Sequence, residues 1–228
     1  MELVEALRTT GSERRFSDRP VDLTSVYDVL NDARFAPSGG NRQSWRVIVV
    51  NDRLQRRAVR NIYLDAWHDY VAHLLAGVVP FSPLASEDDR AAAAARRSEA
   101  EAASTPDGFA ETLDDVPAML VVCADLRALA ATDRDLERYQ IVGGASVYPF
   151  IWNILLAARA RELGGVMTTV ATRNEAALRS VLRIPEHFAV ASIVALGHPV
   201  RRHTKLTRRT VEEFTTLDTF DGTALRRS

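Results

Sequence analysis

The stretch that decides the fold is residues 36–45, APSGGNRQSW, which stands directly before the apolar run at residues 47–50. Its glycines let a ligand approach the main-chain N–H groups closely, because a glycine has no Cβ to stand in the way. Pro37 stiffens the turn, and the side chains of Ser38 and Asn41 can form hydrogen bonds. The loop therefore suits a planar ligand with polar edges, although a glycine-containing loop taken alone is also typical of a plain connection.

The chain has 228 residues, of which 46% are hydrophobic and 26% are charged, and its formal net charge is −1. This length predicts a single domain over residues 1–228 with one sizeable core. The small net charge gives no overall field toward nucleic acid or an anionic membrane, so neither is an expected partner.

The single cysteine, Cys123, excludes an internal disulfide framework. It lies in the apolar run at residues 119–123, which predicts a buried and unreactive thiol. The first residues are acidic and hold no long apolar run, so we expect no signal peptide. These features together favour a cytoplasmic location.

Residues 141–158 carry no charge and are long enough to be considered as a membrane span. Polar and helix-breaking residues dilute the stretch, namely Gly143, Gly144, Ser146, Pro149 and Asn153. We therefore predict a helix that is buried on all sides, either inside the domain or at a subunit interface.

Apolar spacing and breaker residues predict the remaining elements. Helices are expected over residues 2–8, 25–35, 54–75, 133–163 and 174–182, and strands over residues 46–51, 118–124, 166–170 and 188–196. Gly164 and Gly165 are interpreted as the stop of the long helix. Strands that alternate with helices predict, by pattern alone, a doubly wound parallel sheet.

Two segments stand apart from this pattern. Residues 70–112 form a helical and loop excursion, which is either draped over a pocket or a solvated low-complexity insertion. Tyr63, Trp67 and Tyr70 lead into it and are either stacking groups for a substrate or core residues. Residues 200–228 form a C-terminal arm whose apolar spacing predicts docking onto another surface.

Several kinds of catalytic site are not indicated. No strand is followed by the glycine patterns that cradle phosphates in dinucleotide-binding and P-loop proteins. His68 and His73 are five residues apart, whereas a helical metal site needs four, so we expect no metal. No GxSxG elbow is present, and no catalytic side chain is identified.

Two basic clusters remain as candidates for binding an anion. Ser12, Arg14 and Arg15 follow the first helix, and residues 205–209 (KLTRR) stand near the other end of the chain. Guanidinium groups bind phosphate well because their donors form a planar fork. Each cluster alone is typical of a surface salt-bridge patch, but the loop at residues 36–45 favours a phosphorylated ligand.

Taken together and in their order along the chain, the motifs of this sequence resemble those of the nitroreductase-like FMN-dependent oxidoreductases. The likeness runs from residue 3 to residue 214, interrupted mainly by residues 70–107. The segments that carry it are residues 14–21 (RRFSDRPV), 36–46, 144–160, 164–169 (GGVMTT), 182–185 (LRIP), 196–199 (LGHP) and 208–209.

The resemblance implies an α+β fold with a mixed, largely antiparallel sheet flanked by helices, in a homodimer with FMN at the interface. It replaces the parallel sheet that the pattern predicts. The charge-free helix would then be interface core, and the tail would be an arm that crosses the partner.

The resemblance also implies roles for individual residues. The cofactor-binding residues expected from it are Gly11, Ser12, Arg14 and Arg208 at the FMN phosphate and ribityl chain, Pro37, Ser38, Gly39 and Asn41 at the isoalloxazine, and Met167, Thr168 and Thr169 at the flavin edge. The chain departs from relatives in having no arginine near Thr10 or Gly11, which removes one cationic contact, and in having Ser44 where proline is usual.

The function implied is electron transfer from NAD(P)H through FMN to an electron-poor small molecule, such as a nitroaromatic, a quinone or a conjugated carbonyl. No side chain need act as an obligatory acid or base, because the cofactor carries the chemistry. Two alternatives stay open: an FMN-dependent oxidase, dehydrogenase or dehalogenase of a specialised metabolite, and a non-catalytic flavin-binding protein.

Overall fold

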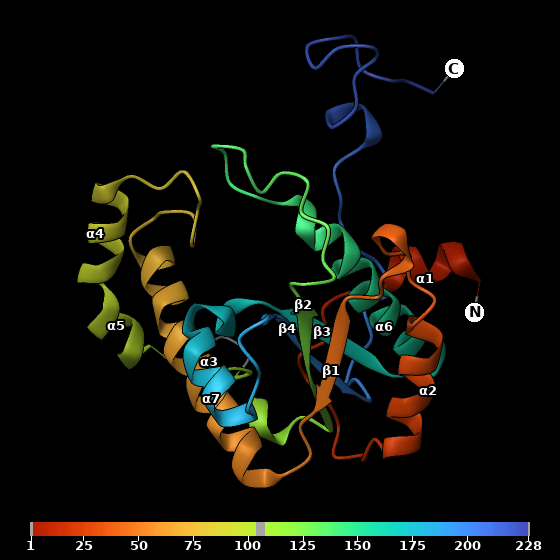
Figure 1. The fold of residues 1–228 in the computed structure, drawn as a ribbon, viewed down its shortest axis with the longest axis vertical. Coiled ribbons are helices and arrows are strands. Elements are labelled where there is room, and N and C mark those ends of the chain that lie inside the picture. The colour runs from red at the N-terminus through yellow and green to blue at the C-terminus, as the bar shows by residue number, and fades with distance from the viewer. Residues whose placement is uncertain (1, 104–107, 228) are drawn as a thin grey trace.

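The computed structural model describes residues 2–103 and 108–227, and its centre is one four-stranded sheet (Figure 1). The strand order is β1-β2-β4-β3, and every pair of neighbours is antiparallel. The strands are β1 (Trp45–Val49), β2 (Ala118–Asp125), β3 (Gly164–Thr168) and β4 (Phe188–Gly197). The prediction of a doubly wound parallel sheet is wrong, because alternation of strands and helices does not fix the direction of the strands. The antiparallel sheet that the resemblance implies is confirmed.

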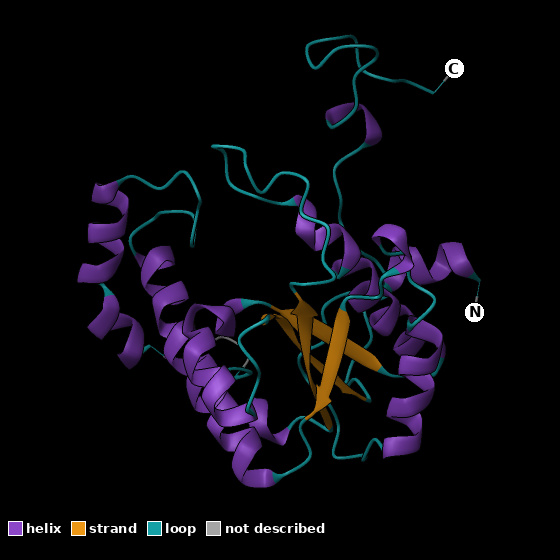
Figure 2. Cartoon of the chain, viewed as in Figure 1, coloured by secondary structure: helices purple, strands orange, loops and turns teal. Residues whose placement is uncertain are grey.

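Helices cover both faces of the sheet (Figure 2). On one side, α2 (Leu23–Ala33) and α6 (Tyr148–Ala160) pack with Leu120 and Val122 of β2. On the other side, α3 (Arg53–Leu75) and α7 (Glu175–Leu182) pack with Met119, Val121 and Cys123 of the same strand. Successive side chains of a strand point to opposite faces. Because helices cover both faces, β2 is a continuous apolar run.

The motif tryptophan fixes the first strand against the charge-free helix. Trp45 of β1 stacks on Phe150 of α6, with ring centroids 4.6 Å apart and planes 2° from parallel. Such a pair is worth about 0.5–1.5 kcal/mol beyond its buried area. The loop at residues 36–45 therefore ends at a fixed point in the core.

The prediction of one long helix over residues 133–163 is wrong. Within it only a 3₁₀ turn, η3 (Val142–Ser146), and α6 are helical. Pro149 lies in the first turn of α6, where its missing N–H costs nothing, whereas in a helix interior it would break the ladder. The carboxylate of Asp133 instead accepts the main-chain N–H groups of Ile141 at 2.8 Å and Val142 at 3.2 Å, which holds a loop.

Gly164 and Gly165 also have a different role from the one predicted. They begin β3 and do not stop a helix, which ends at Ala160. A Cβ on Gly165 would lie 2.8 Å from the carbonyl oxygen of Ala195 on β4. No side chain fits at that distance, so the glycine is required by strand packing.

The excursion contains two short helices, α4 (Glu87–Ala95) and α5 (Arg97–Ala102), which pack on α3. Arg97 of α5 forms ion pairs with Asp65, at 2.6 Å, and with Asp69, both on α3, and these pairs hold α5 there. It also pairs with Glu101 of its own helix at 2.8 Å. The sequence TPDG also predicts a turn at residues 105–108, and most of that turn lies outside the described residues. The two helices therefore pack on α3 and bury Ala93 and Ala100, while most of their other side chains are exposed.

The first helix, α1 (Leu3–Thr9), packs against α6, whereas the C-terminal arm leaves the body of the molecule (Figure 1). The arm carries exposed apolar side chains, and Phe220 is 100% exposed. Among the described helices, none has both the length and the apolar character to cross a bilayer.

We predict that Cys123 is unreactive in the native protein. Burial is the main cause that raises the pKa of its thiol to about 11, and the charge of Glu175 adds to it. Since the thiolate is the nucleophile, the fraction available at pH 8 is about 100-fold lower than for an ordinary thiol. Alkylation by iodoacetamide, followed by mass spectrometry, should be negligible before unfolding and complete in urea. Equal labelling rates in both states would contradict the buried position.

Candidate functional site

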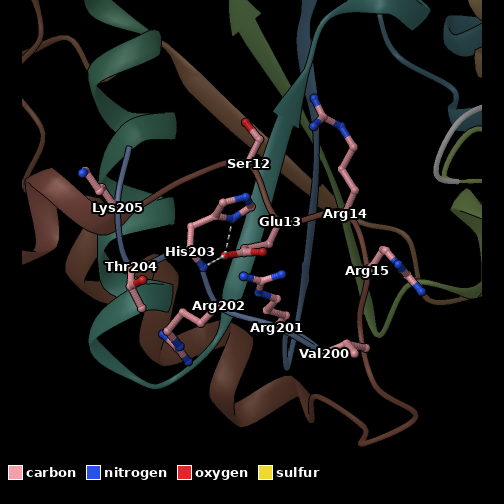
Figure 3. Close-up of a pocket in the computed structure, with 10 residues that line it drawn as sticks. All are labelled: Ser12, Glu13, Arg14, Arg15, Val200, Arg201, Arg202, His203, Thr204 and Lys205. Carbon is pink, nitrogen blue, oxygen red and sulfur yellow. Dashed lines mark hydrogen bonds and ion pairs between the residues drawn. The ribbon is translucent and has the colours of Figure 1, made fainter. Parts of the chain in front are cut away.

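The N-terminal segment and the root of the C-terminal arm form the two walls of a groove of about 910 Å³ (Figure 3). Residues 12–15 line one wall and residues 200–205 the other. The first wall lies along β3, because Ser12 bridges Gly165 and the N–H of Glu13 donates to the carbonyl of Gly165 at 2.9 Å. The two walls are joined where the N–H of Val200 donates to the carbonyl of Arg15 at 3.0 Å.

A carboxylate ties the arm to the body. Oε1 of Glu13 accepts the main-chain N–H of His203 at 2.9 Å and lies 2.8 Å from its Nδ1 (Figure 3). Glu13 is only 7% exposed, so little of this residue is open to solvent. Hydrogen bonds in a buried setting are stronger than in water, and the two contacts of Oε1 fix where the arm leaves at His203.

The groove is strongly cationic. Within the described residues, none of its lysine and arginine side chains forms an ion pair, and its one carboxylate is tied to His203. Nearby, burial and then repulsion by Arg202 lower the pKa of the Arg159 guanidinium. The cationic side chains that line the groove are Arg14, Arg15, Arg201, Arg202 and Lys205. Unpaired guanidinium groups suit a phosphate group.

The loop at residues 36–45 lines a different and smaller cavity, of about 280 Å³. Pro37, Ser38 and Gly39 face it together with Ser146, and the N–H of Gly39 donates to Oγ of Ser146 at 3.0 Å. Oγ of Ser38 accepts the N–H of Gln43 at 2.9 Å, so this hydroxyl stabilises the turn. The groove and this cavity share no lining residue.

Other predicted site residues lie elsewhere. Asn41, at φ +52°, does not line the small cavity, and its side-chain oxygen accepts from Nε2 of Gln43 at 3.2 Å. Met167 and Thr168 end β3, and Thr169 follows. Oγ1 of Thr168 lies 3.4 Å from the hydroxyl of Tyr63, which is 2% exposed and therefore a core residue.

Gly11 and Arg208 show how the arm shapes the groove. A Cβ on Gly11 would lie 3.1 Å from Leu206 and 3.2 Å from His203, so the arm occupies the space that a longer residue needs. Arg208 lies exposed on the arm, donates to the neighbouring Thr207 carbonyl at 2.7 Å, and does not line the groove.

The structure thus brings Ser12 and Arg14 together but leaves Arg208 and the Pro37 loop apart from them in one subunit. Sequence reasoning missed Arg201, Arg202 and the tie from Glu13 to His203. A signal was present for the two arginines, because they directly follow the turn that ends the last strand. The contact of Glu13 spans 190 positions along the chain and left no local pattern.

The comparisons identify the family. A model of the nitroreductase family matches residues 7–198, and the chain belongs to that family. It is similar to an NADH dehydrogenase of Thermus thermophilus, with 28% identity over 188 residues and 82% of each chain covered. It is also similar to a nitrobenzene nitroreductase of Ectopseudomonas oleovorans, with 25% identity over 220 residues that cover 93% of this chain and 95% of the relative.

A solved structure shares the fold. Iodotyrosine deiodinase bound to FMN and 3-iodo-L-tyrosine superposes with a TM-score of 0.66 and 19% identity, and the match covers 96% of this chain and 100% of that one. The nitroreductase-like fold that the sequence motifs imply is therefore confirmed.

We predict that Glu13→Ala loosens the root of the arm. The change leaves the His203 N–H without its acceptor and should lower the free energy of unfolding by about 1–3 kcal/mol. Urea unfolding measures the loss, and the rate of tryptic cleavage at residues 201–209 should rise with it. Glu137→Ala, at an exposed position, is the control that should change neither. An arm that stays as protease-resistant as in the wild type would contradict the tie.

Proposed function

We propose that this chain is an FMN-dependent oxidoreductase that passes electrons from NAD(P)H to an electron-poor small molecule. The observation that carries the proposal is the cationic groove formed by both ends of the chain, in a member of the nitroreductase family. Nitroaromatics, quinones and conjugated carbonyls are the acceptor classes that fit. Relatives with dehydrogenase and nitroreductase names support the same reaction class, and we place the activity in the cytoplasm.

The groove residues fit the phosphate of FMN. Arg14 lies on the same wall as the hydroxyl of Ser12, and Arg202 lies on the opposite wall, where its Nη2 donates to the carbonyl of Glu162 at 2.6 Å. Neither guanidinium forms an ion pair with a carboxylate of the described residues. The arginine that relatives carry near Gly11 is absent here, but Arg201 and Arg202 bring guanidinium groups to the groove from the arm. We infer that these arm residues compensate for the missing contact.

The site is complete only with a second copy of the chain. The groove and the cavity beside Pro37 share no lining residue, so we propose that the groove of one subunit and the Pro37 loop of its partner hold the same flavin. Tyr148 and Trp152 of α6 are 41% and 37% exposed, and Phe214 of the arm is 58% exposed. A partner subunit would bury these apolar side chains, which supports a homodimer.

When bound, FMN would supply the redox chemistry that takes a hydride from NAD(P)H and passes the electrons to the acceptor. The protein's part is position and electrostatics. Arg14 and Arg202 would neutralise the phosphate, Pro37, Ser38 and Gly39 would flank the ring, and the residues at the end of β3 would face its edge. No proton-transferring side chain is required in this scheme.

We predict that Arg14→Ala weakens FMN binding through the phosphate alone. Loss of a charge-assisted hydrogen bond worth about 1.5–3 kcal/mol should raise the Kd for FMN about 10- to 100-fold. Riboflavin, which lacks the phosphate, should bind the variant and the wild type equally in fluorescence titrations. Arg57→Ala on α3, which removes a 3.8 Å ion pair between Arg57 and Asp114, is the matched control. Equal losses for FMN and riboflavin would contradict phosphate binding in the groove.

The redox reaction is tested by anaerobic stopped-flow. NADH or NADPH should bleach the bound flavin absorbance, and an added nitroaromatic or quinone should restore it. Bound flavin that neither nicotinamide reduces would contradict the reductase and favour the non-catalytic alternative. Reduction by a metabolite in place of NAD(P)H would favour an oxidase or dehydrogenase.

A further inference from the structure

A second cavity lies at the far end of α3, under the excursion. Its volume is about 390 Å³, which is within the range of small-molecule sites. Five segments contribute to its wall: His73 comes from α3, Phe81 from the loop that follows, Arg90 from α4, Tyr139 from the loop before η3, and Arg173 from η4 (Val170–Asn174). The groove that we assign to the flavin phosphate shares none of these residues.

This cavity presents two guanidinium groups without an acidic partner. Nη1 of Arg90 donates to the carbonyl of Ala85 at 2.6 Å, and the guanidinium of Arg173 lies 4.9 Å from the ring centroid of Phe81. Across the described residues, no carboxylate forms an ion pair with either arginine. The one carboxylate on the wall, Asp69, is already bound by Arg97. The cavity is therefore electropositive and suited to an anion.

The same wall also presents flat aromatic surface. Phe81 lies 4.7 Å from His73 and 6.4 Å from Tyr70, measured between ring centroids. Its φ of +55° is unusual for a residue other than glycine. Strain of this kind, of about 1–3 kcal/mol, persists where the surroundings fix the conformation, and it is common at ligand sites. The exposed phenol of Tyr139 faces the same cavity.

An aromatic stack joins the cavity to the proposed flavin edge. Tyr63 stacks on Trp67 at 6.2 Å, and Trp67 stacks on Tyr70 at 5.0 Å, along one side of α3. Tyr63 contacts Thr168 at the end of β3, and Arg173 follows Thr169 by four positions. The aromatic surface along α3 therefore runs from the cavity to Thr168 of β3, which lies at the proposed flavin edge.

The walls of the cavity are held in place from both sides. Arg97 fastens α5 to α3 through Asp65 and Asp69. On the other side, Asp133 accepts from Nη1 of Arg138 at 2.9 Å and from the N–H groups of Ile141 and Val142, which fixes the loop that carries Tyr139. The cavity is therefore preformed, and binding there does not require the ordering of a wall.

We propose that this cavity binds the carboxylate end of an aromatic acid, and that such acids are the acceptors of the enzyme. Arg90 and Arg173 engage the carboxylate, and Phe81 and Tyr139 pack against the aromatic ring. The proposal rests on the proposed function, since the reducible end of the acid must reach the flavin. It names a substrate class: aromatic carboxylates that carry a reducible group.

The first test compares 4-nitrobenzoate with its neutral analogue 4-nitrobenzamide as acceptors for the FMN-loaded protein with NADH. The wild type should have the higher kcat/KM for the carboxylate. Arg173→Gln and Arg90→Gln should each lower that value about tenfold or more, mainly through KM, and should leave the amide within twofold. Arg96→Gln, a control on the excursion outside the cavity, should change neither substrate.

Three results would overturn the assignment. Equal losses for the carboxylate and the amide would show a structural role only, and unchanged kinetics would show no role in binding. A loss that depends on the use of NADPH, with NADH turnover unchanged, would assign the arginines to the 2′-phosphate of that cofactor.

A binding measurement separates this proposal from the proposed function. Benzoate is not reducible, and calorimetry without any nicotinamide reports its binding to the FMN-loaded protein directly. Binding by the wild type that both glutamine variants lose supports the cavity, even if NAD(P)H fails to reduce the flavin. Flavin reduction together with benzoate binding that is absent, or equal in all variants, would overturn the cavity assignment alone.

Discussion

The pairing of the N-terminal segment with Gly165 is the contact on which the groove depends. Ser12 bridges Gly165, and Glu13 donates to its carbonyl at 2.9 Å. At this contact there is no room for a side chain, since a Cβ on Gly165 would lie 2.5 Å from Leu196 and 2.8 Å from the carbonyl of Ala195. Only glycine meets that constraint. Once residues 12 and 13 are fixed there, the carboxylate of Glu13 is in position to bind His203.

The bond from Glu13 to His203 then brings the two ends of the chain into one binding surface. Neither basic cluster alone differs from an ordinary surface patch, but together they place several unpaired cations around one groove. The loop at Pro37, which we propose as the opposite wall of the flavin site, lines a separate cavity of the same chain. The proposed function makes dimerisation a condition of cofactor binding, and it assigns the exposed apolar residues of α6 and the arm to that proposed assembly.

Local patterns predicted most elements, because burial on one helix face and capping residues such as Asp22 are properties of neighbouring residues. Strand direction and the loop held by Asp133 were not predictable in this way, since both depend on long-range contacts. At the site, the motifs indicated Arg14 and the Pro37 loop. They did not indicate Glu13, Arg201 or Arg202, whose positions follow from the path of the arm.

Subunit complementation tests the shared flavin site most directly. Arg14→Ala weakens phosphate binding in the groove and Gly39→Val adds a side chain to the loop, so after extensive dialysis neither variant alone should retain FMN. Mixed, unfolded and refolded together, they should form dimers with one intact site, from the groove of one subunit and the loop of the other. The account predicts recovery of about a quarter of the wild-type bound flavin, for random pairing of equal amounts. No recovery from a mixture that forms dimers would contradict a site shared between subunits.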